Sequence, residues 1–140
     1  MELHEISDRL EIADLLARYA DAIDNQRWDD LDEVFTPDAV IDYTAFGAPR
    51  GDLASTKVFL AKVLPGHVSY AHMLGLPVVR IDGDTATART PCHNPMVFHD
   101  KEGKEQIYTC GLWYEDELVR TDAGWRIAER VEVRCYLTGL

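Results

Sequence analysis

The stretch that decides the fold runs from Leu15 to Tyr43 and reads LLARYADAIDNQRWDDLDEVFTPDAVIDY. Its beginning continues a pattern that starts at Glu5, in which apolar residues recur every three or four positions: Leu10, Ile12, Leu15, Leu16, Tyr19 and Ile23. This spacing is typical of a helix with one buried face. The polar residues 24–26 interrupt the period, so the sequence predicts a long first helix that ends at Asp24.

The second half of the stretch predicts a short helix followed by a strand. The helical spacing resumes at Trp28, Leu31, Val34 and Phe35. We expect this helix to end before Pro37, because a proline disfavours helical backbone in the residue before it. The β-branched and aromatic residues of Ala39–Thr44 are typical of a strand.

Outward from this stretch, the rest of the chain predicts one more helix and then only strands. Leu53–Val63 has helical spacing, and Pro65 and Gly66 end it. Four strands follow, at His67–Arg80, Thr85–Phe98, Gln106–Val119 and Trp125–Leu137, with turns at Asp82–Asp84, His99–Lys104 and Thr121–Gly124. The order of elements, without a linker or an internal repeat, indicates an α+β fold in which three N-terminal helices pack on an antiparallel sheet. We expect residues 1–140 to form a single domain.

The last strand alternates between apolar and charged residues. One parity holds Trp125, Ile127, Val131, Val133, Cys135 and Leu137, and the other holds Arg126, Arg130, Glu132 and Arg134. The alternation predicts that the first set faces the core and the second faces solvent. Glu129 interrupts the apolar set, and three interpretations stay open: a pocket carboxylate, a satisfied polar group of the core, or a β-bulge.

Composition excludes several classes of function. The chain has 140 residues, 46% of them apolar, and a net charge of −11, which disfavours nucleic acids and anionic membranes as partners. No apolar run approaches the roughly 18 residues that span a bilayer, and the N-terminus lacks the features of a signal peptide. We therefore expect a cytoplasmic protein. We expect its three cysteines, Cys92, Cys110 and Cys135, to be buried reduced thiols.

Strand parity also sorts the polar residues that could carry chemistry. On Thr85–Phe98 the even positions are mostly apolar, so Asn94 points inward and His93 outward. His72 shares a parity with large apolar residues, and on its own it reads as a hydrogen-bonded core histidine. Asp24 alone reads as a solvated turn residue and Tyr19 as a core aromatic.

The short catalytic motifs with fixed spacing are absent. The chain has no G-x-x-x-x-G-K, H-E-x-x-H, G-x-S-x-G or G-x-G-x-x-G sequence. Its five histidines are not spaced as a set of metal ligands. The sequence therefore predicts neither a metal site nor a cofactor.

The stretch Leu15–Tyr43 resembles the opening of SnoaL-like proteins of the nuclear-transport-factor-2-like superfamily. The resemblance continues through Gly83–Ala86 and Gly124–Ile127, so it covers nearly the whole chain. It implies a cone, in which a strongly curved antiparallel sheet wraps over helices and encloses an apolar pocket. The order of elements derived above agrees with such a fold.

Within this superfamily the chain is most similar to scytalone dehydratase and the bile-acid dehydratases. Their acid–base residues correspond here to Asp24, Tyr43 and His72, and Tyr19 matches a helix tyrosine of the bile-acid enzymes. The second histidine of the scytalone enzyme has no counterpart, since it aligns near Met96. We expect the substrate to contact Asn94, Met96 and Trp28.

The resemblance implies a cofactor-independent dehydratase that acts on a small hydrophobic hydroxy-carbonyl compound. In such a reaction a His72–Asp24 pair removes the α-proton, and Tyr19 and Tyr43 polarise the carbonyl. Several alternatives stay open: a ketosteroid-type isomerase, an epoxide hydrolase or polyketide cyclase, a non-catalytic small-molecule-binding domain, or a dimerising domain. We also expect a homo-oligomer, either a dimer or a trimer.

Overall fold

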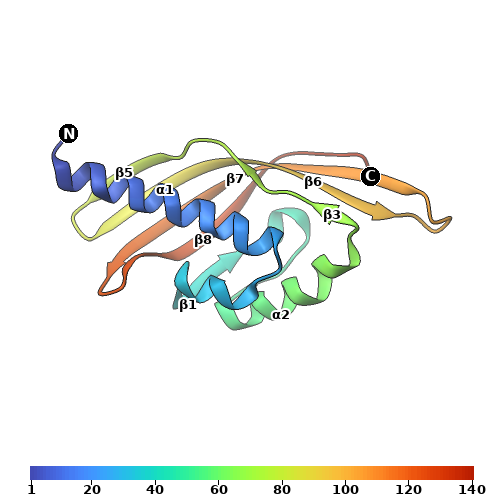
Figure 1. Ribbon diagram of the computed structural model, residues 1–140, viewed down its shortest axis with the longest axis horizontal. Coiled ribbons are helices and arrows are strands. Elements are labelled where there is room, and N and C mark those ends of the chain that lie inside the picture. The colour runs from blue at the N-terminus through green and yellow to red at the C-terminus, as the bar shows by residue number, and fades with distance from the viewer.

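Helix α1 (Leu3–Asp24) lies along one face of the sheet in the computed structural model, which describes residues 1–140 (Figure 1). Its buried stripe includes Ile12, Leu15, Leu16, Tyr19 and Ile23, as the apolar spacing predicts. Helix α2 (Leu53–Val63) also matches its predicted bounds, and Asp52 caps it by accepting a hydrogen bond from the Ser55 backbone N–H. A short 3₁₀ helix, η3 (Leu64–Gly66), follows it.

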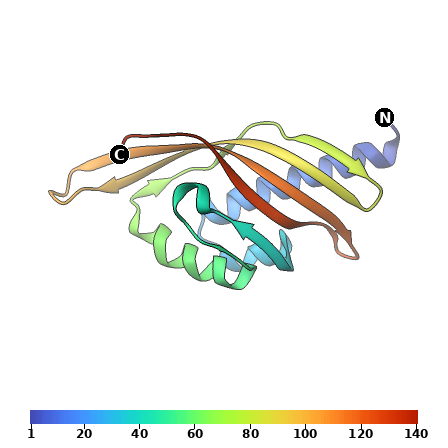
Figure 2. The same cartoon turned by 180° about the vertical axis from the view of Figure 1, so that it is seen from behind.

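The sheet has eight strands and is open at both edges. Its strand order is β2-β1-β8-β7-β6-β3, and β4 and β5 also pair with β6. The three long antiparallel strands are β6 (Thr85–His99), β7 (Glu105–Thr121) and β8 (Gly124–Thr138). Seen from behind, they bend together over the helices (Figure 2). The predicted α+β fold with a curved sheet and N-terminal helices is therefore confirmed.

The segment after α1 differs from the sequence prediction. Its helix is of the 3₁₀ type, η1 (Trp28–Glu33), and the chain is already extended at Phe35, where β1 (Phe35–Asp42) begins. Pro37 lies inside this strand and does not end a helix. The strand tolerates it because the parallel pairing of β1 with β8 is interrupted between Phe35 and Val40, so no hydrogen bond is needed from the proline nitrogen.

The segment predicted as one strand from His67 to Arg80 is broken into three. They are β3 (Ser69–Tyr70), β4 (Met73–Leu74) and β5 (Val78–Asp82), all antiparallel to β6. Gly75 and Pro77 lie between the last two, and neither favours a continuous strand. Leu76 is consequently 92% exposed, although it is one of the large apolar residues that share the parity of His72. The first break contains His72.

Strand β8 contains an extra residue that inverts its parity. Glu117 of β7 lies opposite Glu129, but the next pair is Leu118 with Ile127, so Ala128 has no partner. Such a bulge turns the following side chains to the other face of the sheet. Trp125 and Ile127 are buried as predicted, but Arg130 is fully buried too.

The predicted face of the residues beyond the bulge is therefore wrong. Arg130, Glu132 and Arg134 point to the side of the sheet that α1 covers, which we call the inner face. Arg134 lies within cation–π distance of the inner residue Phe46, at 5.3 Å. Of the three interpretations of Glu129, the structure supports the β-bulge.

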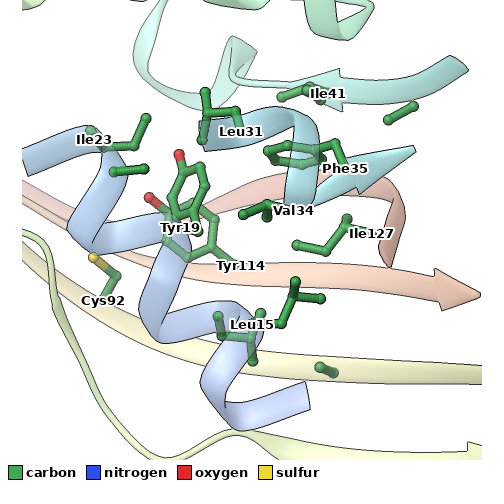
Figure 3. Packing of buried hydrophobic residues seen from close by; sticks show 14 of the residues in the cluster. Leu15, Tyr19, Ile23, Leu31, Val34, Phe35, Ile41, Cys92, Tyr114 and Ile127 are labelled. Carbon is green, nitrogen blue, oxygen red and sulfur yellow. The ribbon is translucent and has the colours of Figure 1, made fainter. Parts of the chain in front are cut away.

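The core fills the space between α1, β1 and the inner face. It is a cluster of 25 buried residues, and Figure 3 shows Tyr19 and Tyr114 side by side within it. All three cysteines are free, and Cys92 and Cys110 are buried. Cys135 is exposed, so its predicted burial is wrong, because the bulge at Ala128 turns it, like Val131 and Val133, to the face away from α1. No helix of the chain has the length and apolar character that a membrane crossing requires.

Candidate active site

Asp24 and His72 are in direct contact, although 48 positions separate them in the sequence. Asp24 ends α1, and His72 lies in the break between β3 and β4. One carboxylate oxygen of Asp24 lies 2.7 Å from Nδ1 of His72, and the other accepts a hydrogen bond of 2.9 Å from the His72 backbone N–H. The two bonds fix both the ring and the backbone of the histidine.

This contact determines which nitrogen of His72 is basic. Because the carboxylate can only accept, Nδ1 carries a proton, so in the neutral form of the ring the lone pair lies on Nε2. Nε2 makes no hydrogen bond within the protein and is not sealed off from solvent. The side chain of His72 is 9% exposed and that of Asp24 is 24% exposed, so the pair lies at the edge of the core. The arrangement can take a proton from a molecule bound at Nε2.

Tyr19 and Tyr43 form a second polar pair beside the first. Their hydroxyl oxygens are 2.5 Å apart, and the ring of Tyr19 is 6.5 Å from the ring of His72. Asp42 positions Tyr43, since its carboxylate accepts hydrogen bonds from the backbone N–H and hydroxyl of Thr44 and closes a turn after β1. The structure therefore brings together all four residues that the resemblance implied as catalytic.

Burial keeps these phenols protonated. It raises the pKa of Tyr19 to about 12 and raises the pKa of Tyr43 well above 10. A protonated phenol in a dry site is a hydrogen-bond donor for an oxygen that gains negative charge. Burial also raises the pKa of Cys92 to about 12, so that its thiol is not an ionised nucleophile.

The three residues expected at the substrate lie in different surroundings. Asn94 is buried, and its side-chain amide donates to the carbonyl of Ala71, which holds the segment next to His72. Met96 is buried in the core cluster, whereas Trp28 is partly buried and packs against its edge. The inward position of Asn94 and the exposed position of His93 agree with the parity of β6. Whether any of the three contacts a substrate stays a prediction.

Parity reasoning missed a buried ion pair under the tyrosines. Arg130 of β8 and Asp116 of β7 are paired in the sheet register, and two hydrogen bonds of 2.7 and 2.8 Å join their side chains. The guanidinium carbon lies 4.2 Å from the ring centre of Tyr19 and 3.9 Å from that of Tyr114. Burial alone would lower the pKa of Arg130, but the Asp116 carboxylate holds that pKa well above its usual range.

One guanidinium nitrogen of this pair stays without a partner. Nη1 of Arg130 is buried and makes no hydrogen bond in the protein. The arrangement keeps a permanent positive charge beneath the Tyr19–Tyr43 pair. The one cue in the sequence was Glu129, whose mismatch with the strand pattern marks the bulge that turns Arg130 inward.

The main hollows of the surface lie elsewhere. One of about 470 Å³ is lined by Arg80, Thr87, Arg89, Glu117 and other residues of the sheet, most of them on the face away from α1. None of the main hollows includes His72 or Asp24. An apolar pocket at the site therefore stays a prediction.

Residues 4–131 match the family model described as the SnoaL-like domain. The chain belongs to the SnoaL-like family. The resemblance to SnoaL-like proteins seen in the sequence is thereby confirmed. This SnoaL-like chain is also 54% identical to the uncharacterized protein Rv2910c of Mycobacterium tuberculosis (strain ATCC 25618 / H37Rv) over 136 residues, which cover 97% of this chain and 91% of that protein.

Solved structures share the fold of this SnoaL-like chain. Hexachlorocyclohexane dehydrochlorinase LinA-type3 from Novosphingobium barchaimii LL02 superimposes with a TM-score of 0.81 at 18% identity, covering 100% of this chain and 94% of that one. A candidate scytalone dehydratase from Novosphingobium aromaticivorans DSM 12444 superimposes with a TM-score of 0.83 at 16% identity, covering 97% of this chain and 89% of that one. At these identities the likeness establishes the fold alone.

Proposed function

We propose that this SnoaL-like protein is a cofactor-independent lyase that removes water from a small hydrophobic β-hydroxy carbonyl compound. The observation that carries the proposal is the double hydrogen bond between Asp24 and His72. It orients the imidazole so that Nε2, which makes no hydrogen bond in the protein, is available as a base.

The residues of the site divide the reaction between them. Nε2 of His72 takes the proton from the carbon next to the carbonyl, and Asp24 stabilises the imidazolium that forms. The electron pair of that C–H bond moves toward the carbonyl oxygen, where the protonated Tyr19–Tyr43 pair donates hydrogen bonds to the enolate. The electron pair of the enolate then forms the C=C bond as the hydroxyl group leaves the neighbouring carbon. The substrate's own carbonyl holds the electron pair between the two steps, and the electrons of the broken C–O bond leave with the departing oxygen, which takes up a proton to become water.

Two neighbours in fold agree with this class of reaction. One is named a dehydrochlorinase and the other a candidate scytalone dehydratase, so both names describe an elimination. Elimination of HCl and elimination of water share their first requirement, a base that removes a proton from carbon. The family of this chain thus supports a lyase or isomerase, and the His72–Asp24 pair at the edge of the core favours proton abstraction.

The aldol adduct of benzaldehyde and acetone is a suitable first substrate, because its dehydration gives benzylideneacetone, which absorbs strongly in the ultraviolet. We expect the wild-type protein to produce this absorbance. His72→Ala and Asp24→Asn should each lower kcat/KM by about 10²–10⁴-fold, as loss of a general base or of its orienting carboxylate does in other enzymes. Asp21→Asn, an exposed carboxylate one turn earlier in α1, is the matched control and should keep its rate.

Proton exchange separates the alternatives. In D₂O, a lyase or an isomerase exchanges the α-proton of a bound ketone, which NMR detects, and only a lyase releases water. A binding domain does neither. Full exchange and turnover in both His72→Ala and Asp24→Asn would contradict the proposal.

A further inference from the structure

Glu132 lies on the inner face in the same transverse row as the tyrosines. In the sheet register Glu132 is opposite Tyr114, and Tyr114 is opposite Thr90. On the other side, β1 ends with Asp42 opposite Val131, so the next residue, Tyr43, comes beside Glu132. The bulge at Ala128 is the reason that this carboxyl group faces inward and not toward solvent.

The carboxyl group of Glu132 has no partner within the protein. It takes part in none of the hydrogen bonds or ion pairs, although Arg130 lies only two residues away. Asp116 occupies two nitrogens of that arginine, so the buried charge is already matched. Burying a carboxyl group without a hydrogen-bond partner reduces the free energy of unfolding. Its oxygens are not sealed off from solvent, so a bound molecule can reach them.

The surroundings of Glu132 favour its protonated form. Burial raises the pKa of Glu132 to about 8, although the charge on Arg130 opposes the shift. The other titratable groups that face it or act on it come from α1, β1, β6, β7 and β8, and they are Tyr19, Asp42, Tyr43, Cys92, Cys110, Tyr114 and Arg134. All of its phenol and thiol neighbours are themselves protonated at neutral pH because burial raises their pKa.

We propose that Glu132 is the general acid of the site, which gives its proton to the hydroxyl group that leaves. This inference rests on the proposed function, where His72 takes the α-proton but no residue has yet been assigned to the departing oxygen. The C–O bond breaks, its electron pair stays on oxygen, and the proton of Glu132 completes a water molecule. The electron pair of the former α-C–H bond forms the second bond of C=C. Glu132 is left as a carboxylate and His72 as an imidazolium, and proton exchange with solvent restores both.

The substrate must then carry a leaving group that needs a proton. This requirement distinguishes a dehydratase from an enzyme that expels chloride, which leaves as a stable anion. It also predicts a decline of kcat/KM as the pH rises through about 8, because the acid works only while protonated.

Two substrates that differ only in the leaving group test the assignment. One is the aldol adduct of benzaldehyde and acetone, and the other is its acetate ester, which expels acetate without protonation. For Glu132→Gln we expect kcat/KM to fall by about 10²–10⁴-fold on the hydroxy ketone. The fall on the ester should be less than tenfold, and the alkaline decline on the hydroxy ketone should disappear. His72→Ala should lose both reactions.

Controls keep the outcomes distinct. Glu129→Gln removes a carboxyl group from the outer side of the same strand and should keep both rates and the alkaline decline. Infrared difference spectra should show a protonated carboxyl band at pH 7 that Glu132→Gln lacks, which checks the group without any substrate. Equal losses on the two substrates, or a carboxyl group already ionised at pH 6, would overturn the acid role. If the wild-type protein eliminates neither group, the proposed function fails and this assignment fails with it.

Discussion

At the scale of single residues, both carboxylate oxygens of Asp24 bind the same histidine, His72. The ring and the backbone N–H of His72 are held together, so the break between β3 and β4 is tied to the end of α1. The same contact that would orient a base therefore also holds the segment that carries it. Asn94 adds a third tie through the carbonyl of Ala71.

Replacing Tyr43 with phenylalanine tests the second polar pair. The change removes the hydroxyl group that bonds to Tyr19 and leaves the ring in the core. We expect kcat on the aldol adduct to fall by about 10²-fold with little change in KM, since the bond to the oxygen strengthens only as negative charge develops. Steady-state kinetics measures both constants. An equal rise in KM with unchanged kcat would assign Tyr43 to substrate binding alone.

Glu132 should also make the stability of the fold depend on pH. Because burial raises its pKa from 4.5 to about 8, the folded state holds this proton more tightly than the unfolded state does. The stabilisation of the folded state by this bound proton is complete below pH 4.5 and is lost as the pH rises through about 8.

Urea unfolding of the wild-type protein and Glu132→Gln at pH 5 and pH 9 measures the effect. The variant should gain stability relative to the wild type as the pH rises, with an upper bound of about 5 kcal/mol. Other carboxylates titrate alike in both proteins and cancel from the comparison. A constant difference at the two pH values would show that Glu132 is not shifted.

The sequence identified some of these residues and not others, for a physical reason. Asp24, His72, Tyr19 and Tyr43 could be named from the resemblance, because each lies on an element whose position follows from the fold. Arg130 and Glu132 were assigned to the solvent side, since strand parity assumes an unbroken ladder. Their true position depends on one unpaired residue, Ala128, and the mismatch of Glu129 with the strand pattern is compatible with a bulge but does not establish one.

At the scale of elements, Asp8 joins the start of α1 to the hairpin of β7 and β8. Its two oxygens accept hydrogen bonds of 2.7 and 2.9 Å from Arg120, and one also accepts a bond of 3.0 Å from the indole N–H of Trp125. The bond to Arg120, followed by the one to Trp125, lowers the pKa of Asp8 to about 2. This anchor lies at the end of the helix away from the candidate site.

Asp8→Asn should therefore reduce the free energy of unfolding without a loss of activity. At pH 7 we expect a reduction of about 1.5–3 kcal/mol, the range for hydrogen bonds to charged groups. The contribution of Asp8 is present above pH 3.8 and is lost as the pH falls through about 2, so the two proteins should converge in acid. Denaturant titrations at several pH values give the comparison, with Asp14→Asn, an exposed carboxylate of the same helix, as control.

The pair of Arg130 and Asp116 joins β8 to β7 just beyond the bulge. Breaking it with Asp116→Asn should cost about 3–5 kcal/mol, because a buried guanidinium loses its counter-charge. Replacing both residues at once with Arg130→Met and Asp116→Leu should cost less than the single change, since no buried charge is left. Thermal unfolding of the two variants decides between them. A double variant less stable than Asp116→Asn would contradict this account.

The sequence predicts the elements that local burial patterns stabilise and misses those that depend on distant pairing. Helices α1 and α2 and the long strands follow from periodic burial, which is local information. The 3₁₀ form of η1 and the strand start at Phe35 do not, because pairing with the distant strand β8 extends the chain there. The break between β3 and β4 has a similar reason, because the backbone N–H of His72 bonds to the distant Asp24, whereas the break between β4 and β5 contains Gly75 and Pro77.

At the scale of the whole molecule, the predicted homo-oligomer must overcome a net charge of −11 on each copy. The Debye length shortens from about 30 Å to about 10 Å as salt rises from about 0.01 M to about 0.1 M. Because salt screens the repulsion between copies, we expect the oligomeric fraction to rise over this range. Sedimentation velocity measures it. A monomer at every salt concentration would contradict the prediction of a dimer or trimer.

The bulge at Ala128 also divides the inner face of β8 into an apolar part and an ionisable part. Before Ala128, β8 contributes the apolar side chains of Trp125 and Ile127 to the core. After Ala128, it contributes ionisable side chains such as Arg130 to the same face. If Ala128 were paired in an uninterrupted ladder, Val131 would lie opposite Tyr114 and Val131 and Val133 would face inward in place of Arg130 and Glu132, whereas deletion of Ala128 would leave those two residues on the inner face. An aliphatic side chain would then stand beside Tyr114 where Glu132 now places its carboxyl group, so one inserted residue decides whether this position can carry a proton.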